Sequence, residues 1–156
     1  MDQKNALVLR LELIWWLFTA LVVIGVLFPI LKNTDNYPFL LANIIFIVVF
    51  ITLTRYFFLL KHTFLAKQQV LKVIAIVACI PLLFYLVNQV NLFQTFLDEN
   101  GIKGILPNMI EANLVGVGRY VKSEMLLFGV GSIIITAMFP IRMLTSIWKT
   151  RNRGTA

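Results

Sequence analysis

The 156-residue sequence contains one cysteine, Cys79, and one histidine, His62, so it has few of the side chains that bind metals or form disulfides. A single cysteine cannot form an internal disulfide bond or a thiolate metal site, and one imidazole cannot hold a haem between two histidines. The sequence also offers no Ser/His/Asp set and no pair of catalytic carboxylates. We therefore expect no metal, no cofactor and no enzymatic activity.

Charge is also scarce. Charged residues make up 13% of the chain and hydrophobic residues 60%, whereas a soluble domain has about 25% charged residues. A soluble chain of this size cannot bury so much apolar surface, because a large share of its residues remains at the surface. These proportions exclude a soluble enzyme, a nucleic-acid-binding domain and a disordered chain. The net charge of +7 is better explained by anionic lipid than by nucleic acid.

What the sequence has in abundance is long uncharged apolar runs. Four of them approach the ~20 residues that a helix needs to cross the hydrocarbon layer, and such continuous runs favour helices over barrel strands. We predict an all-α integral membrane protein, an antiparallel bundle of four transmembrane helices that forms a single domain, 1–156. The helices are expected at about 8–31, 38–60, 70–94 and 124–148.

The distribution of lysine and arginine predicts how the helices are oriented. With the N-terminus inside, ten of these residues lie on the cytoplasmic side and four outside, as the positive-inside rule requires. Both termini are then cytoplasmic, and we expect a bacterial-type inner (plasma) membrane.

The outer loop, about 95–123, is the largest segment expected outside the membrane. Residues 98–101 predict a turn, and Pro107 could open a short helix. Apolar residues then recur at helical spacing, opposite polar or small ones, which predicts a short amphipathic helix on the outer leaflet or across the end of the bundle. The apolar residues are Ile110, Leu114, Val117 and Val121, and those opposite are Glu111, Gly118 and Lys122.

Five ionisable residues are expected near the inner ends of the helices: Arg10, Glu12, Arg55, Lys72 and Arg142. One hypothesis is a basic pocket that holds a phosphate, a lipid headgroup or another anion. The other is that the cations extend to the interface and one of them pairs with Glu12, the single acid of this inner-leaflet polar cluster. We predict that Glu12 faces the bundle and contacts Arg55, Lys72 or Arg142.

A second polar cluster, Asn88, Gln89 and Asn91, lies at the expected outer end of the third helix. These amides could line an outward vestibule, lie at the interface, or hydrogen-bond across helices. Gly129 and Gly131 predict close helix packing in the fourth helix, as Gly25 does in the first.

With no catalytic set and wide apolar helix faces, the sequence favours a non-catalytic accessory or scaffold subunit of a larger inner-membrane complex. One alternative is a small homo-oligomeric channel or transporter for an anionic solute. Another is a protein that binds or modifies lipid headgroups. The expected partners are the lipid bilayer and either another membrane protein or further copies of this chain.

Overall fold

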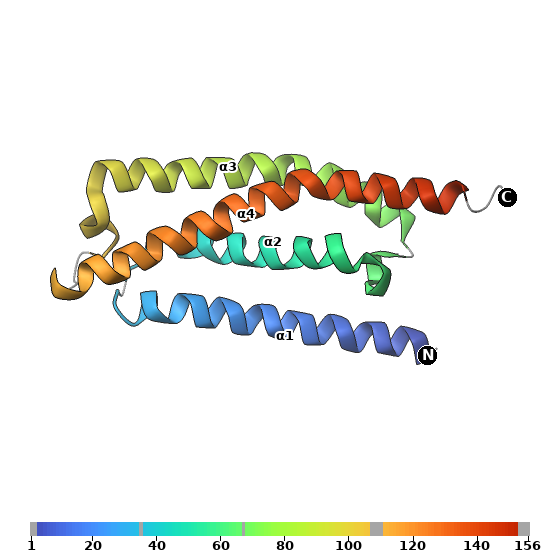
Figure 1. The fold of residues 1–156 in the computed structure, drawn as a ribbon, viewed down its shortest axis with the longest axis horizontal. Helices are drawn as coiled ribbons and strands as arrows, with labels where there is room; N and C mark the ends of the chain where they lie inside the picture. Colours follow the sequence, from blue (N-terminus) through green and yellow to red (C-terminus); the bar gives the residue numbers. More distant parts are fainter. Residues whose placement is uncertain (1–2, 35, 67, 107–110, 153–156) are drawn as a thin grey trace.

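The computed structural model describes residues 3–34, 36–66, 68–106 and 111–152, and all regular structure within them is helical. The helices are α1 (Gln3–Leu31), α2 (Leu40–Leu59), α3 (Gln69–Ile105) and α4 (Glu111–Asn152), with two short 3-10 helices, η1 (Leu60–His62) and η2 (Phe64–Ala66), between α2 and α3. Each of the four α-helices has a stretch long and apolar enough to cross a membrane. Both termini lie at the same end of the bundle (Figure 1), here called the terminal end. The predicted all-α architecture of four membrane-length helices is confirmed.

Helix α4 is the centre of the packing, since it lies against both α2 and α3, while α1 makes fewer contacts at the side (Figure 1). The close approach of α4 to α3 and to α2 depends on Gly129 and Gly131, the two glycines predicted to allow it. A Cβ at Gly129 would lie 2.8 Å from Val90 Cγ2, and one at Gly131 would lie 2.8 Å from Phe50 Cε2. The prediction for Gly25 is wrong, because nothing lies within 4 Å of its Cβ position. The middle of the bundle is therefore filled by side chains.

Helices α3 and α4 are longer than the sequence predicted. Their 37 and 42 residues exceed the ~20 residues that a helix needs to cross the hydrocarbon layer. The prediction of a loop at 95–123 is wrong, because α3 continues to Ile105 and α4 begins at Glu111. The predicted turn at 98–101 survives as a kink at Gly101, whose φ of 64° is a conformation that glycine adopts easily.

The predicted amphipathic segment forms the first turns of α4 and is not a separate element. Leu114 and Val121 are buried and Lys122 is exposed, as predicted; Pro107 and Ile110 lie outside the described residues. The expectation that Gly118 lies on the polar face is wrong, since it is buried and a Cβ there would overlap Ile102 Cγ2. Glycine has no side chain and so carries no polarity signal, which is why the pattern misplaced it.

Candidate functional site

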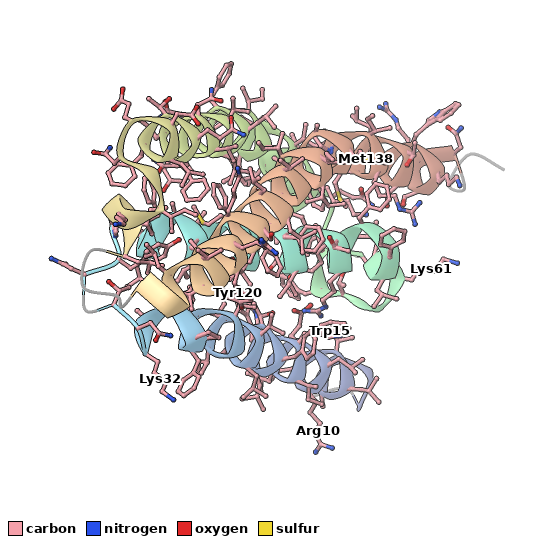
Figure 2. The ribbon with its side chains drawn as sticks, turned by 60° about the vertical axis from the view of Figure 1, so that its left-hand side comes forward. Arg10, Trp15, Lys32, Lys61, Tyr120 and Met138 are labelled. Atoms are coloured by element: carbon pink, nitrogen blue, oxygen red, sulfur yellow. The ribbon has the colours of Figure 1, made fainter. Side chains whose placement is uncertain are left out.

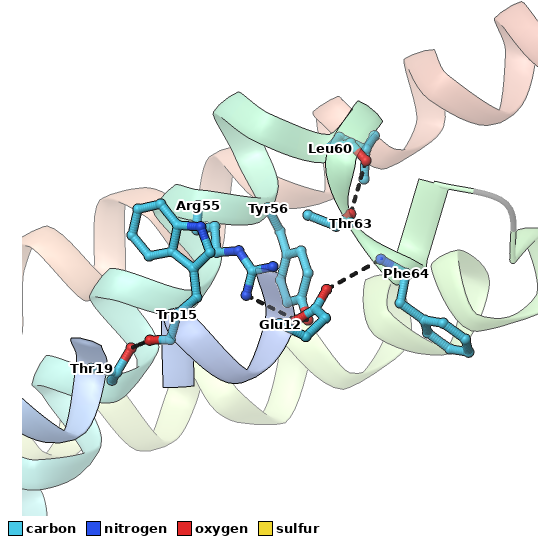
Figure 3. Close-up of polar contacts among 8 residues, drawn as sticks. All are labelled: Glu12, Trp15, Thr19, Arg55, Tyr56, Leu60, Thr63 and Phe64. Atoms are coloured by element: carbon cyan, nitrogen blue, oxygen red, sulfur yellow. Dashed lines mark hydrogen bonds and ion pairs between the residues drawn. The ribbon is translucent and has the colours of Figure 1, made fainter. Parts of the chain in front are cut away.

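Glu12 points from α1 towards α2 and η2, and its carboxylate is the centre of a polar contact at the terminal end (Figure 3). Arg55 Nη1 donates to Glu12 Oε2 at 2.9 Å, and the backbone N–H of Phe64 donates to Oε1 at 3.2 Å. The Tyr56 hydroxyl lies 3.4 Å from Oε2. The side chains of Arg55 and Glu12 are only 6% and 13% exposed. The predicted contact between Glu12 and Arg55 is confirmed.

Two aromatic rings enclose the guanidinium of Arg55 (Figure 3). Its Cζ lies 5.4 Å from the centroid of the Trp15 ring and 5.3 Å from that of Tyr56, within the range of cation–π attraction. Arg55 thus joins α2 to α1 through both charge and ring contact. We call Glu12, Arg55 and the Phe64 N–H the α1 clasp, because they connect the least packed helix to the rest of the bundle.

Lys72 does not join the clasp. It lies in the first turn of α3, is fully buried, and donates from Nζ to the carbonyl of Ala66 at 2.8 Å and to Ser146 Oγ at 3.1 Å. Both acceptors are neutral, and the carboxylate of Glu12 pairs with Arg55 instead. Lys72 is therefore a buried cation that lacks an acidic partner in the described part of the chain.

Arg142 lies near Lys72 on the next helix. Its Nε donates to the carbonyl of Phe57 at 3.1 Å, and its side chain lines a cleft of about 450 Å³ at the terminal end. We call this the basic cleft. Its walls are Leu60, Lys61, Ala66, Arg142, Ser146, Lys149 and Thr150, so three cations and no acid line it.

Arg10 is exposed and points away from the bundle (Figure 2). The five residues predicted as one cluster are thus divided among three places: Glu12 and Arg55 in the α1 clasp, Lys72 and Arg142 at the basic cleft, and Arg10 on the outer surface of α1. The structure thus confirms the predicted ion pair of Glu12 and places Arg142 in a separate cleft lined by cations.

The predicted outer cluster of amides does not line the interior. Asn88 and Asn91 are exposed on the outward face of α3, and Gln89 is half-buried. These side chains therefore do not form a vestibule inside this chain.

A buried polar contact that the sequence analysis missed connects α2 to α4. Asn43 Nδ2 donates to Glu124 Oε1 and lies 3.4 Å from the hydroxyl oxygen of Tyr37. All three side chains are buried. Glu124 Oε2 and Asn43 Oδ1 have no hydrogen-bond partner among the described residues. Burial, and then the charge of Glu124, raise the pKa of the Tyr37 hydroxyl above its ordinary value, so Tyr37 stays protonated.

One signal could have placed Glu124 inside. It lies three residues after Val121 and seven after Val117, on the helix face that the apolar pattern already marked as buried. Among the described residues no three His, Cys, Asp or Glu side chains gather as metal ligands. What the terminal end offers chemically is anion binding by lysine and arginine, and what the opposite end offers is a buried carboxyl group. The chain matches no family model, no curated protein sequence and no solved structure.

Proposed function

We propose that this chain is a non-catalytic accessory subunit of a larger membrane complex, and that α3 contacts a transmembrane helix of another polypeptide. One observation carries the proposal: Asn88 and Asn91 point away from their own bundle. On the same face Phe84 is 74% exposed, and Val87 and Leu92 beside them are 40% and 49% exposed. Asn88 thus lies in an apolar outer surface, and Asn91 lies near its edge, since Gln94 and Thr95 one turn further on are also exposed.

The depth of these amides supports a protein partner. Val90, between them in sequence, packs on Gly129 of α4. At that level α4 exposes Leu127 and Val130, so the surroundings are apolar. An amide in hydrocarbon seeks a hydrogen bond, and in membrane proteins a neighbouring helix commonly supplies it. The partner we infer is a helix with a hydrogen-bonding side chain at this depth.

The experiment compares wild type with a variant carrying Asn88→Leu and Asn91→Leu, both purified from membranes in mild detergent. We expect a partner polypeptide in equimolar amount with wild type and its loss from the variant. Val130→Leu, on α4 at the same depth, is the matched control and should retain the partner. Equal recovery with wild type and the double variant would contradict the proposal.

A photoreactive residue at Val87 distinguishes this function from the channel alternative. We expect it to crosslink to the same partner polypeptide, whereas Leu21 on the exposed face of α1 should not. Crosslinks from Val87 only to a second copy of this chain would instead favour a homo-oligomeric channel.

We further propose a bacterial-type inner membrane with both termini in the cytoplasm, supported by the ten-to-four distribution of lysine and arginine. Ser123 is exposed at the end opposite the termini. A cysteine there should react with an impermeant reagent added outside intact cells, while Cys79, which is buried, stays unlabelled. Labelling of Ser123→Cys only after the membrane is opened would reverse the orientation.

A further inference from the structure

The basic cleft at the terminal end is lined by three cations and by no acidic side chain that would balance them. Lys61 and Lys149 are exposed at its rim and Arg142 is half-buried. Behind them Lys72 is fully buried with two neutral acceptors. An unpaired buried charge is costly, and the first turn of α3, where Lys72 lies, adds the positive end of the helix dipole.

Ser146 connects the buried lysine to the cleft. Its Oγ accepts from Lys72 Nζ at 3.1 Å, so its own hydroxyl hydrogen is directed elsewhere, and the hydroxyl donates no hydrogen bond to another described residue. Ser146 also lines the cleft. The hydroxyl can therefore donate to an anion in the cleft while Lys72 polarises it from behind. Arg142 has Nε occupied by the Phe57 carbonyl, which fixes its guanidinium plane at the wall.

We propose that the basic cleft binds a phosphate group, with Arg142 and Ser146 as direct donors, Lys61 and Lys149 as rim cations, and Lys72 as a positioning residue behind Ser146. The phosphate belongs either to an anionic lipid headgroup or to a free phosphate ion. A planar guanidinium beside a hydroxyl matches phosphate oxygens well. Basic pockets between helices are a common way to hold lipid phosphates, and the volume of about 450 Å³ is within the range of small-ligand sites.

This site is independent of the proposed partner surface, which uses other residues near the opposite end of α3. The test uses the full chain in zwitterionic detergent, titrated with short-chain phosphatidylglycerol, short-chain phosphatidylcholine or inorganic phosphate. Bound ligand is counted by native mass spectrometry. We expect one phosphatidylglycerol per chain. Phosphatidylcholine carries a phosphate without net negative charge, and we expect it to bind at least tenfold more weakly.

Two double variants, each of which removes two positive charges, test whether the basic cleft is the phosphate-binding site. Lys61→Ala with Lys149→Ala should weaken phosphatidylglycerol binding about 25-fold, at about fivefold for each cation. Arg10→Ala with Arg151→Ala removes two exposed charges at the same end, outside the cleft, and should change binding less than threefold. All four side chains are exposed, so these variants should fold.

Inorganic phosphate identifies the source of the group. If millimolar phosphate displaces the lipid from the cleft, the phosphate group alone is sufficient for binding and a free phosphate ion can occupy the site. If it does not, while the two variant pairs differ as expected, binding requires the lipid headgroup. Equal binding of phosphatidylcholine and phosphatidylglycerol, or equal losses in the two variant pairs, would overturn the proposal.

Discussion

Removing Arg55 should release α1 before the rest of the bundle unfolds. Arg55→Ala leaves the Glu12 carboxylate, 13% exposed, with only the Phe64 N–H and the Tyr56 hydroxyl as donors. Stranding one member of a buried ion pair costs about 3–5 kcal/mol, and the lost cation–π contacts add to this. Because α1 has the fewest packing contacts with the other helices, the loss should appear there first.

The conservative change separates charge from hydrogen bonding. Glu12→Gln keeps an acceptor oxygen but removes the charge, and the difference between a charged and a neutral hydrogen bond is about 1 kcal/mol. Replacing both Glu12 and Arg55 with leucine removes the pair completely, and such replacements are often close to neutral. The changes in the free energy of unfolding should therefore be strongly non-additive, and Arg55→Ala should be the most destabilising of the three variants.

The assay is unfolding in mixed micelles of increasing SDS content. Trp15 packs on Arg55, so its fluorescence reports the α1 clasp once the exposed Trp16 and Trp148 are changed to phenylalanine. In Arg55→Ala, the Trp15 signal should change at a lower SDS fraction than the helical circular dichroism. If both signals change together at the wild-type midpoint, or if single and double variants add within about 0.5 kcal/mol, the clasp does not stabilise the fold.

Two further predictions concern α4, both measured as SDS midpoints. Gly118→Ala should cost about 1–3 kcal/mol, because its Cβ overlaps the branched side chain of Ile102. Gly116→Ala, with open space around it, should stabilise the helix by about 0.5–1 kcal/mol; equal effects would refute the close contact. Glu124→Ala should cost about 1–3 kcal/mol by leaving the buried amide of Asn43 with only the longer contact to the Tyr37 hydroxyl, whereas Glu124→Gln keeps an acceptor oxygen and should retain the wild-type midpoint. A large loss in Glu124→Gln would mean that the carboxylate charge itself is required.

The membrane-length helices were predictable because hydropathy reports the solvent of a segment. Hydropathy does not report whether the backbone stays helical outside the apolar run. The C-terminal end of α3 and the N-terminal end of α4 were missed for this reason. Residues 95–105 lie beyond the predicted helix end, yet they are helical apart from the kink at Gly101, and Phe96 there packs on Phe39 with ring centroids 5.3 Å apart. Such contacts depend on residues more than 50 positions away and cannot be read from local pattern.

Some of the polar contacts could also be predicted from the sequence and others could not. Glu12 was predictable as the partner of a cation, because it was the single acid expected among several cations at one depth. The contact of Asn43 with Glu124 joins residues 81 positions apart and depends on how α2 and α4 are rotated about their axes. The separation of Lys72 from Glu12 was also unpredictable. Counting charges does not show that the Lys72 ammonium donates its hydrogen bonds to Ser146 Oγ and to the Ala66 carbonyl.

The contact between Asn43 and Glu124 also has a consequence for biogenesis. During synthesis α2 emerges well before α4, so the Tyr37 hydroxyl, 3.4 Å from Asn43 Nδ2, is the one acceptor near this amide among the described residues until Glu124 arrives. Helix α4 contains the least apolar of the four candidate spans, with a mean hydropathy of 1.9 against 2.6 for α3, and it carries a carboxyl group into the bilayer. We expect α4 to insert stably only once α2 is in place, because Asn43 of α2 donates to Glu124. We therefore expect the second helix to help retain the last one in the membrane, and in a chain that stops before α4 we expect the Asn43 amide to depend on the weaker, longer contact with the Tyr37 hydroxyl.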